Sequence, residues 1–559
     1  MRSLKGEKKI SRRRFLHSSL NKSALLAAST IAPISLGSCE TGNNYPFDIV
    51  IKNGTVFNGV DSNPSVVDIG VKGDKITFIG KINGKANQTL NAEGLAIMPG
   101  FIDIHTHCDL TFRRTGWKRH LAHVMPSWKG NYNYLSQGVT TVVTGNCGYG
   151  YADMDEWYGI TDSVGFGTNV YHLAPHGMIR EELFGADQPR ELSRSQLDRF
   201  KKRLEEEMQK GAIGFSTGLE YAPGLLASTD ELVELCKVVN RYNGIYATHV
   251  RNESGAIDVN TGEVMAVQSI NEAIEIGKRS GIPVEISHLK IAAPINGHPA
   301  SLVLNPIEKA RADGLRVTAD QYPYNAGSTI ISILLPDQFR SSVGVKESYK
   351  TREGKNEIRK AIKEVFTYLG PDKTLVTMYP EKEEYEGKTI LQISEIENRS
   401  PEDSYADMVC EDNSPMGVFF HQDINVVRDI MANDFIITGS DGWTVPKDMT
   451  RPHPRTYGSF PRKLRQFVLE EKIIDLSMAI RSMTSLPAET FNMPGRGKLQ
   501  AGYFADIVAI DMDRIKDNAT YLDPHKYSTG VTHLIVNGSL SIKEGEFTGE
   551  RAGKSLRKS

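Results

Sequence analysis

The 559-residue chain has few cysteines, almost no net charge and no long apolar run in its body, and each of these scarcities excludes a class of protein. Five cysteines are too few for a secreted domain stabilised mainly by disulfides. The 66 basic and 68 acidic side chains give a formal net charge of −2, which offers no basis for binding nucleic acid. Beyond residue 39, no stretch holds the roughly 20 consecutive apolar residues that a membrane-spanning helix requires. A composition of 39% hydrophobic and 24% charged residues is instead typical of a globular enzyme.

The first 39 residues are predicted to be an export signal that is not part of the fold. Residues 11–20, SRRRFLHSSL, contain adjacent arginines followed by Phe15 and Leu16, and the weakly hydrophobic residues 24–39 end in small side chains before Cys39. This pattern resembles a twin-arginine signal that ends in a lipoprotein cleavage box, with Cys39 as the lipidated residue. A soluble basic tail is the alternative. We therefore expect an exported periplasmic or cell-envelope lipoprotein whose only membrane contact is its lipid anchor.

Both ends of the remaining chain have the pattern of short antiparallel strands. Residues 48–82 alternate apolar and polar side chains between Asn-Gly and Gly-Asp turns. Residues 495–513 and 531–547 have the same character. These segments predict a small β-sandwich domain assembled from residues 45–98 and 491–549.

Between these ends, over residues 99–490, apolar strand-like runs alternate with amphipathic helical patterns. Runs such as 138–146, 245–250 and 283–288 alternate with helical segments such as 194–211 and 264–281. Repeated βα units of this kind predict an α/β fold, a parallel sheet closed into a (β/α)8 TIM-type barrel, with the active site at the C-terminal ends of its strands.

A charged segment interrupts this alternation after the seventh predicted strand. It covers about residues 336–416 and includes KESYKTREGKNEIRKAIKEVF. We expect either a solvated helical insertion or a lid over the active site, since long insertions near the mouths of barrels often have that role.

Metal-binding side chains stand at the ends of several predicted strands. His105 and His107, in PGFIDIHTHCDL at residues 99–110, are two positions apart, so an extended strand directs both to one face. Two imidazoles placed in this way can bind one divalent cation such as Zn²⁺. In chain order, later strand ends supply further candidates for the same site: Cys147, His249, His288 and Asp441.

This order of side chains resembles the amidohydrolase superfamily, in which two paired histidines, two further histidines and a late aspartate surround one or two divalent metals. Four blocks, at residues 138–148, 211–224, 320–329 and 453–462, narrow the resemblance to the N-acyl-D-amino-acid deacylase (D-aminoacylase) family. The resemblance runs from about residue 48 to about residue 549. Two segments depart from the usual pattern, PHGMIR at 175–180 and HVRNE at 249–253, and neither removes a presumed ligand.

The resemblance implies a metal centre and an activity. Cys147, His249 and His288 would hold one tightly bound Zn²⁺, for which a thiolate is a favourable ligand, and His105 and His107 would form a weaker or partly occupied second site. The implied reaction is hydrolysis of the amide bond of N-acyl-D-amino acids, which releases a carboxylate and a free D-amino acid.

Two further roles complete the implied active site. Asp441 is the candidate that takes up a proton and passes it to the departing nitrogen. The carboxylate of the substrate needs partners of its own, and Arg455 offers a planar fork for it. The positions that match the carboxylate-binding set of the family are Lys290, Tyr322, Ser328 and Arg455.

Other readings stay open at this point. An amidohydrolase of the same fold could act on a cyclic amide or a dipeptide, and a surface lipoprotein could bind a ligand without turnover. Asp441 beside a complete set of metal ligands favours a hydrolase, because a binding protein needs no proton shuttle. We expect a small-molecule substrate and no nucleic acid partner. The sequence indicates neither the preferred side chain and acyl group nor the oligomeric state.

Overall fold

The structure is a computed structural model that describes residues 45–113, 122, 124–185, 188–294, 297–340, 342–410, 415–445 and 450–558. The predicted export signal at residues 1–39 lies outside the described residues and stays a prediction. Among the helices that are described, none is long and apolar enough to cross a membrane.

Eight parallel strands form the central sheet, as the alternation of strands and helices predicts. Each strand pairs with the next one along the chain, and the last, β18, pairs with β14. The two edges of the sheet meet beyond the ends of β8 and β18, where the amide of Asp441 donates to the carbonyl of His105 and that of His107 donates to Gly442, both at 2.8 Å. The sheet is therefore a nearly closed barrel. Its strands are β8 (Phe101–Asp103), β9 (Val139–Thr144), β10 (Asn169–Pro175), β11 (Gly214–Gly218), β12 (Ile245–His249), β13 (Val284–Ile286), β14 (Val317–Gln321) and β18 (Ile436–Thr438).

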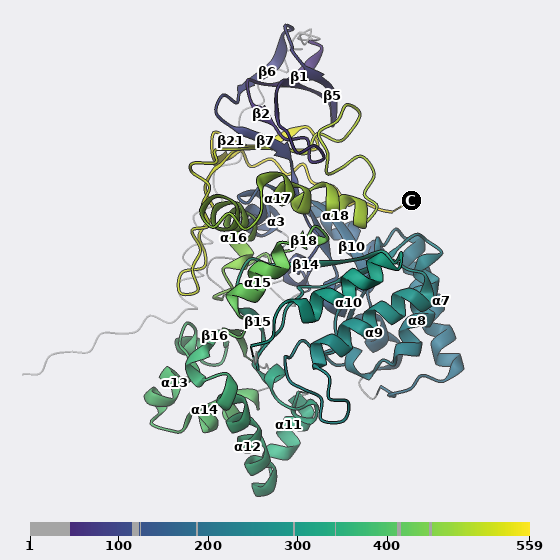
Figure 1. The fold of residues 1–559 in the computed structure, drawn as a ribbon, viewed down its shortest axis with the longest axis vertical. Coiled ribbons are helices and arrows are strands. Elements are labelled where there is room, and N and C mark those ends of the chain that lie inside the picture. The colour runs from purple at the N-terminus through teal and green to yellow at the C-terminus, as the bar shows by residue number, and fades with distance from the viewer. Residues whose placement is uncertain are drawn as a thin grey trace, which may run out of the picture. The chain divides into compact units, whose positions relative to one another are not determined.

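Amphipathic helices connect these strands and cover the outside of the barrel. In α9, for example, Ala266, Ile270, Ala273 and Ile276 are buried at helical spacing, so one face packs on the barrel and the other meets solvent. Figure 1 shows α7 to α10 side by side along the barrel. The helices are α5 (Met154–Val164), α6 (His176–Phe184), α7 (Arg194–Gln209), α8 (Thr229–Asn240), α9 (Met265–Ser280), α10 (Ser301–Ala312), α15 (Ile424–Met431), α16 (Arg455–Arg462), α17 (Leu476–Met483) and α18 (Ser485–Thr490).

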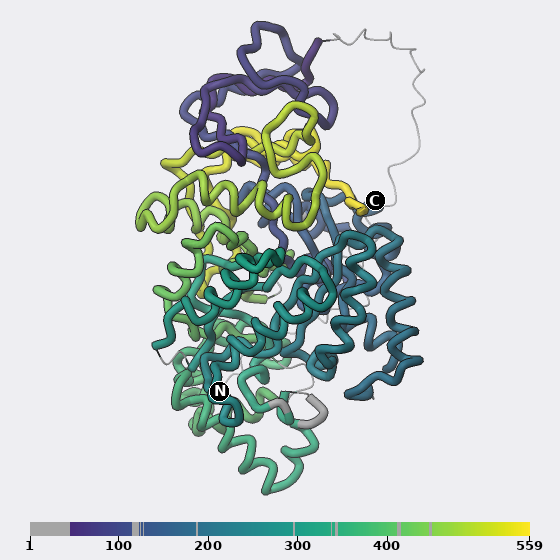
Figure 2. The backbone as a smooth tube through the Cα atoms, turned by 45° about the vertical axis from the view of Figure 1, so that its right-hand side comes forward, coloured from purple at the N-terminus to yellow at the C-terminus, as the bar shows by residue number. Residues whose placement is uncertain are grey.

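The two ends of the described chain build a small β-sandwich, which confirms the prediction from their alternating patterns. One sheet has the order β5-β4-β1-β6, and the other has the order β22-β21-β20-β19-β7-β2-β3. Ile49 and Ile69 of the first sheet and Ile97 and Ile507 of the second share one buried core. Figure 2 shows the purple N-terminal and yellow C-terminal segments side by side, as the pairing of β7 with β19 requires. The strands are β1 (Phe47–Lys52), β2 (Thr55–Val56), β3 (Ser65–Val66), β4 (Asp68–Lys72), β5 (Lys75–Gly80), β6 (Ala86–Asn91), β7 (Ala96–Pro99), β19 (Ile507–Ile510), β20 (Val531–Val536), β21 (Ser539–Lys543) and β22 (Glu546–Phe547).

The chain between β14 and β18 forms a separate substructure around a small antiparallel sheet of order β15-β17-β16. Ile331, Ile358, Ile362, Tyr405 and Phe419 lie in its own buried core, so it is more than a solvated helical insertion. Figure 1 shows its helices beyond one end of the barrel. A lid function stays a prediction. The elements are β15 (Gly327–Ile330), α11 (Ser342–Tyr349), α12 (Arg352–Tyr368), β16 (Thr374–Met378), α13 (Ile390–Glu397), α14 (Pro401–Val409) and β17 (Met416–Phe419).

Candidate metal centre and substrate cavity

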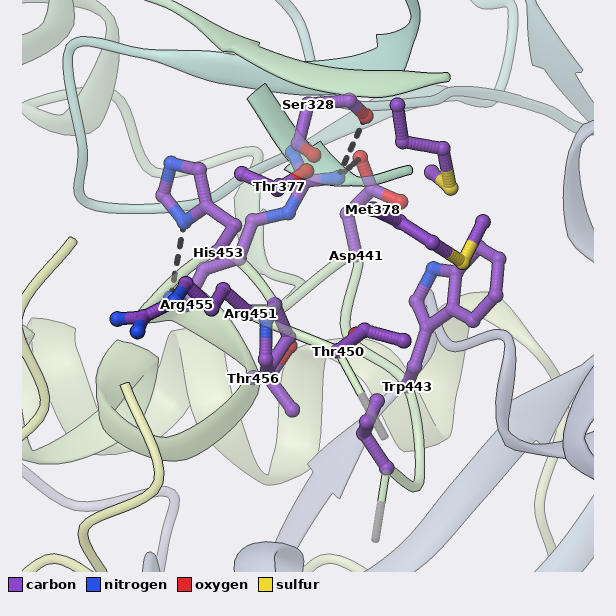
Figure 3. Close-up of a pocket in the computed structure, with 13 residues that line it drawn as sticks. Ser328, Thr377, Met378, Asp441, Trp443, Thr450, Arg451, His453, Arg455 and Thr456 are labelled. Atoms are coloured by element: carbon purple, nitrogen blue, oxygen red, sulfur yellow. Dashed lines mark hydrogen bonds and ion pairs between the residues drawn. The ribbon is translucent and has the colours of Figure 1, made fainter. Parts of the chain in front are cut away.

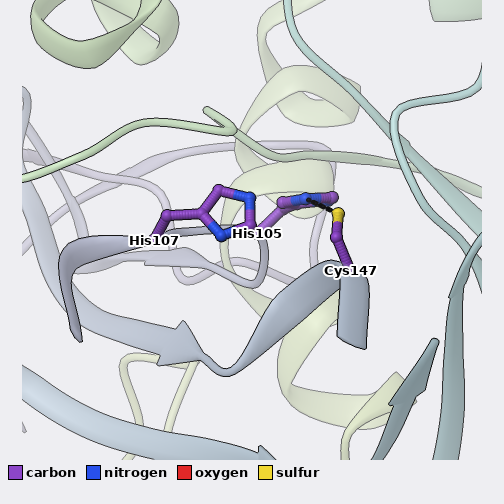
Figure 4. Close-up of side chains that lie close together, drawn as sticks. All are labelled: His105, His107 and Cys147. Atoms are coloured by element: carbon purple, nitrogen blue, oxygen red, sulfur yellow. Dashed lines mark hydrogen bonds between the residues drawn. The ribbon is translucent and has the colours of Figure 1, made fainter. Parts of the chain in front are cut away.

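The six side chains predicted to surround a metal converge at the C-terminal ends of the barrel strands. They form overlapping groups whose candidate ligand atoms lie within 4.8 Å of one another. Figure 4 shows the paired histidines and the thiol gathered at the ends of β8 and β9. These groups are His105, His107 and Cys147; Cys147, His249 and His288; and His105, His288 and Asp441, and all six residues are buried.

Three of these side chains point into the centre because the backbone turns sharply after the strand that precedes each of them. Cys147, His288 and Asp441 have φ angles of 54°, 38° and 50°, in the left-handed region that residues other than glycine adopt rarely. Such conformations cost about 1–3 kcal/mol each and persist where the surrounding structure enforces them. At the first turn, the side-chain amide of Asn146 donates to the carbonyls of Val143 and Ile104, at 3.0 and 3.2 Å. The strand ends are thus built to direct side chains inward.

The donor set fits a zinc ion. The sulfur of Cys147 lies 3.3 Å from Nε2 of His105 and 3.8 Å from Nε2 of His288. Burial would raise the pKa of the Cys147 thiol, but the charge and hydrogen bond of His105 outweigh it and lower that pKa well below its ordinary value. In addition, Nδ1 of His107 and Nδ1 of His249 are buried without a hydrogen-bond partner among the described residues. A thiolate beside imidazole nitrogens that lack partners is the kind of set that binds Zn²⁺.

Three carboxylates that were not predicted from the sequence stand behind three of these histidines. In metal sites, a carboxylate on the second ring nitrogen fixes the tautomer and the orientation of a ligand histidine. Each of these contacts joins side chains from different strands, so no pattern within one strand predicts it. The one signal in the sequence is that these acids lie near strand ends, in or close to the family blocks. The pairs are His105 with Asp320 at 2.9 Å, His249 with Glu220 at 3.0 Å, and His288 with Glu253 at 2.9 Å.

Asp441 lies between the histidines and a buried arginine. Its Oδ1 is 3.1 Å from Nε2 of His107, and its Oδ2 is 2.9 Å from Nη2 of Arg455. Burial would raise the pKa of Asp441, but the charges of Arg455 and His105 and the hydrogen bond of His107 hold it well below its ordinary value. The carboxylate is therefore ionised at neutral pH and can accept a proton.

The predicted carboxylate-binding residues are only partly brought together. The guanidinium of Arg455 lies 4.7 Å from the ring centre of Tyr322. It also donates to the backbone oxygen of Ser328 at 3.2 Å (Figure 3). Lys290 lies at the edge of this group: its ammonium binds Glu253 and is 5.9 Å from the ring centre of Tyr322. Arg455 is thus the cation placed to receive a substrate carboxylate.

One cavity of about 230 Å³ joins the metal donors to Arg455. Its lining includes the metal donors His107, Cys147, His249 and His288, and also Asp441, Ser328 and Arg455. A smaller lobe of about 40 Å³, shown in Figure 3, shares Asp441 and Arg455 with the main cavity. A small amide with a carboxylate could therefore contact the metal donors, Asp441 and Arg455 at the same time.

Comparison with known proteins gives close relatives along nearly the whole chain. The model of the amidohydrolase family matches residues 402–542. D-aminoacylase from Alcaligenes xylosoxydans xylosoxydans is 31% identical over 92% of this chain and 98% of its own. N-acyl-D-glutamate deacylase from the same organism is 31% identical over 91% of this chain and 96% of its own.

A solved structure extends the likeness to three dimensions. The crystal structure of N-acyl-D-glutamate deacylase from Bordetella bronchiseptica contains zinc and a phosphonate inhibitor that mimics the tetrahedral intermediate of its reaction. It matches 91% of this chain and 99% of its own at 28% identity, with a TM-score of 0.75.

Proposed function

The chain belongs to the D-aminoacylase family of amidohydrolases, and we propose that it hydrolyses the amide bond of N-acyl-D-amino acids with the help of zinc. The products are a carboxylate and a free D-amino acid. The observation that carries this proposal is the convergence of three groups in one cavity: the thiol and imidazole donors, the carboxylate of Asp441 and the guanidinium of Arg455.

Substrate binding rests mainly on Arg455. Its planar guanidinium suits a carboxylate, with which it forms two parallel hydrogen bonds. The ring of Tyr322 lies against the guanidinium, and both residues are almost fully buried, so the fork is held in one orientation. A carboxylate bound there directs the adjacent amide across the cavity toward Cys147 and its neighbouring histidines.

Asp441 is the residue placed to move the proton during hydrolysis. A zinc ion held by Cys147, His249 and His288 would supply Lewis acidity for the scissile carbonyl and a water nucleophile near neutral pH. Asp441 accepts the proton that the attacking water loses. It then donates this proton to the nitrogen as the carbon–nitrogen bond breaks, so that a carboxylate and an amine leave.

The metal assignment rests on the chemistry of the donors. We propose one tight zinc site at Cys147, His249 and His288, because, among the groups that the described residues form, this one combines the thiol with two imidazoles that each have a carboxylate behind them. His105 and His107 lie close enough to the same sulfur to form a second, weaker site.

The alternative substrates are a cyclic amide and a dipeptide. A cyclic amide without a free carboxylate leaves Arg455 without a ligand, so the cavity favours a linear substrate with a carboxylate. A dipeptide also has one, and the assay below includes it. A non-catalytic binding role would leave Asp441 without a use beside the metal donors.

The test is hydrolysis by the purified, zinc-loaded protein. N-acetyl-D-leucine, N-acetyl-L-leucine, a leucine dipeptide and hydantoin are supplied separately, and the amine or acid that each releases is measured. The proposal expects turnover of the N-acetyl-D-amino acid well above that of the other three. Preferential turnover of the dipeptide or of hydantoin, or no turnover of any compound, would overturn it.

We also propose that the chain is exported and lipidated, on the basis of the arginines and the small-residue box before Cys39. Replacing Arg12 and Arg13 with lysine should keep the protein in the cytoplasm, and Cys39→Ala should release it from the membrane fraction. Fractionation that is unchanged in both variants would contradict the proposal.

A further inference from the structure

The loop that runs from Asp441 to the start of α16 is tied at both of its ends to one side chain. The side-chain amide of Asn133, in the short helix before β9, donates to the backbone oxygens of Trp443 and Thr456, at 3.0 and 2.9 Å. Trp443 lies two residues after Asp441, and Thr456 directly follows Arg455. Because an amide group carries two hydrogens, Asn133 can hold both carbonyls at the same time.

A second asparagine holds the same loop. The hydroxyl of Thr444 donates to Oδ1 of Asn131 at 2.6 Å, and Nδ2 of Asn131 donates to the hydroxyl of Thr168 at 3.0 Å. Asn131, Asn133 and Thr444 are all buried, with at most 5% of their surface exposed. Hydrogen bonds at such depth are stronger than those at the surface, because water does not compete for them. The loop is therefore fixed to the segment that precedes β9.

The conformation that the two asparagines hold is a strained one. Asp441 has a φ of 50°, which persists where the surrounding structure enforces it. In this conformation its carboxylate lies 2.9 Å from Arg455 (Figure 3) and 3.1 Å from Nε2 of His107. Backbone hydrogen bonds between the two edges of the barrel hold Asp441 itself. Asn133 adds the link from this end of the loop to the backbone beside Arg455.

From this geometry we infer that Asn131 and Asn133 are positioning residues for deacylation, which hold Asp441 and Arg455 at the separation that lets one substrate meet both. The inference rests on the proposed function, from which the roles of Asp441 and Arg455 come. Both asparagines lie outside the described lining of the two cavities, so they act through the loop. The effect on rate can be large, because a displacement of about 1 Å at a reacting group can cost roughly 100-fold.

The direct test is Asn133→Asp. This change keeps the shape of the side chain, removes both donors and places acceptor oxygens against two carbonyl oxygens. In the zinc-loaded enzyme we expect kcat for N-acetyl-D-leucine to fall by roughly 10–100-fold and KM to rise. The preference for this compound over its C-terminal amide should fall as well, because Arg455 loses its fixed orientation. Zinc content should stay as in the wild type.

The readouts separate positioning from a role in stability alone. A residue that only stabilises the fold lowers the amount of folded enzyme and leaves KM and the preference for the carboxylate unchanged. Asn240→Asp is the matched control, since Asn240 also donates to a backbone oxygen, that of Ser280 at 3.2 Å, where α8 meets α9 outside the barrel. It should keep kcat, KM and the preference. Wild-type values of all three in folded, zinc-loaded Asn133→Asp would overturn the inference.

Thr444→Val tests the second contact from the side of the loop. It replaces a hydroxyl by a methyl group of similar size and removes the hydrogen bond to Asn131. We expect changes of kcat, KM and preference in the same direction as in Asn133→Asp, and smaller ones, because one hydrogen bond is lost and no repulsion is added. Wild-type values would exclude Asn131 as a positioning residue. If Asn133→Asp does not fold, Thr444→Val alone decides the inference.

The two levels of the proposal fail in different ways. A zinc-loaded wild-type enzyme that hydrolyses N-acetyl-D-leucine, with variants that match it, contradicts the positioning role and leaves the deacylase function standing. Absence of turnover of N-acetyl-D-leucine by the zinc-loaded wild type contradicts the deacylase function, and the inference fails with it.

Discussion

Arg455 and Asp441 form a buried ion pair, with 2.9 Å between Nη2 of the arginine and Oδ2 of the aspartate. The residue that we propose binds the substrate carboxylate and the residue that we propose moves the proton are thus in direct contact before substrate arrives. A carboxylate that binds Arg455 competes for the same guanidinium and weakens its hold on Asp441. A substrate without a carboxylate leaves the pair intact. We therefore expect binding of the substrate carboxylate to release Asp441 from Arg455 and so to favour proton transfer by Asp441.

The first prediction concerns this link. Arg455→Lys keeps the positive charge and loses the planar fork, so it should lose most of the preference for N-acetyl-D-leucine over its C-terminal amide. The measurement is the ratio of kcat/KM values for the two compounds in wild type and variant. Arg451→Lys, which changes a nearby arginine bound to the Leu522 carbonyl, is the control and should keep the ratio. An unchanged ratio in Arg455→Lys would show that the substrate carboxylate binds elsewhere.

Asp441→Asn preserves size and polarity and removes basicity. We expect kcat to fall by about 10²–10⁴-fold, the usual contribution of general acid–base catalysis. Zinc should stay bound, since the proposed ligand set of Cys147, His249 and His288 does not include Asp441. Single-turnover rates and elemental analysis on one preparation separate the two effects. Near-normal turnover, or loss of zinc together with activity, would contradict the proton-transfer role.

Cys147→Ala tests the tight metal site. Removing a thiolate ligand should weaken zinc binding by at least about 10–100-fold, and activity should fall with metal content. The control is Cys236→Ala, since Cys236 is buried in α8 outside the metal-binding groups and burial raises the pKa of its thiol. Zinc per protein chain is read by elemental analysis after dialysis. Full occupancy in Cys147→Ala would exclude the thiol as a ligand.

The next prediction is that Lys463 makes the stability of the folded protein depend on pH. It is buried, donates to Thr438 and Ser482 at 2.9 and 2.8 Å, and burial lowers its pKa from 10.5 to about 7. Between these two values the unfolded state binds more protons than the folded state, so this residue makes the protein more stable as pH rises. The increase in the free energy of unfolding that Lys463 causes is at most about 1.4 kcal/mol per pH unit.

Lys463→Met should remove that contribution. The free energy of unfolding is measured in urea at several pH values between 7 and 10, and the difference between wild type and variant should grow in favour of wild type as pH rises. Lys202→Met, at an exposed position of α7, is the control and should follow the wild type. A constant difference for Lys463→Met would contradict the predicted protonation change.

The barrel and the metal donors could be predicted from the sequence because they depend on local patterns. The spacing of His105 and His107 fixes a shared face on an extended strand. Cys147 and Asp441 each follow an apolar run whose C-terminal end must face the active site in a barrel. Such signals need only the residues of one strand and the rule for parallel barrels.

The carboxylates behind the histidines could not be predicted in this way. Glu220 follows β11 and reaches His249 on β12, and Asp320 on β14 reaches His105 beyond β8. These contacts exist only once the barrel has closed, so no pattern within one segment reveals them. An acid at a strand end is equally compatible with exposure to solvent.

The inserted sheet was missed for a different reason. Its strands are short, and the charged helices around it dominate the pattern of residues 336–416. Ile330 and Met416 are far apart along the chain, and their pairing places both at the cavity only in the folded structure. The part of the cavity wall that the inserted sheet supplies is therefore the part that local pattern predicts least.

The central claim is that zinc bound at Cys147, His249 and His288 makes this protein a deacylase of N-acyl-D-amino acids. The most direct measurement is a titration of metal-free protein with zinc, with the initial rates on N-acetyl-D-leucine and N-acetyl-L-leucine read at each step. We predict that the rate on the D compound rises in proportion to zinc up to about one equivalent per chain, while the rate on the L compound stays far lower. Full activity in the metal-free protein, or equal rates on the two compounds at every zinc level, would contradict it.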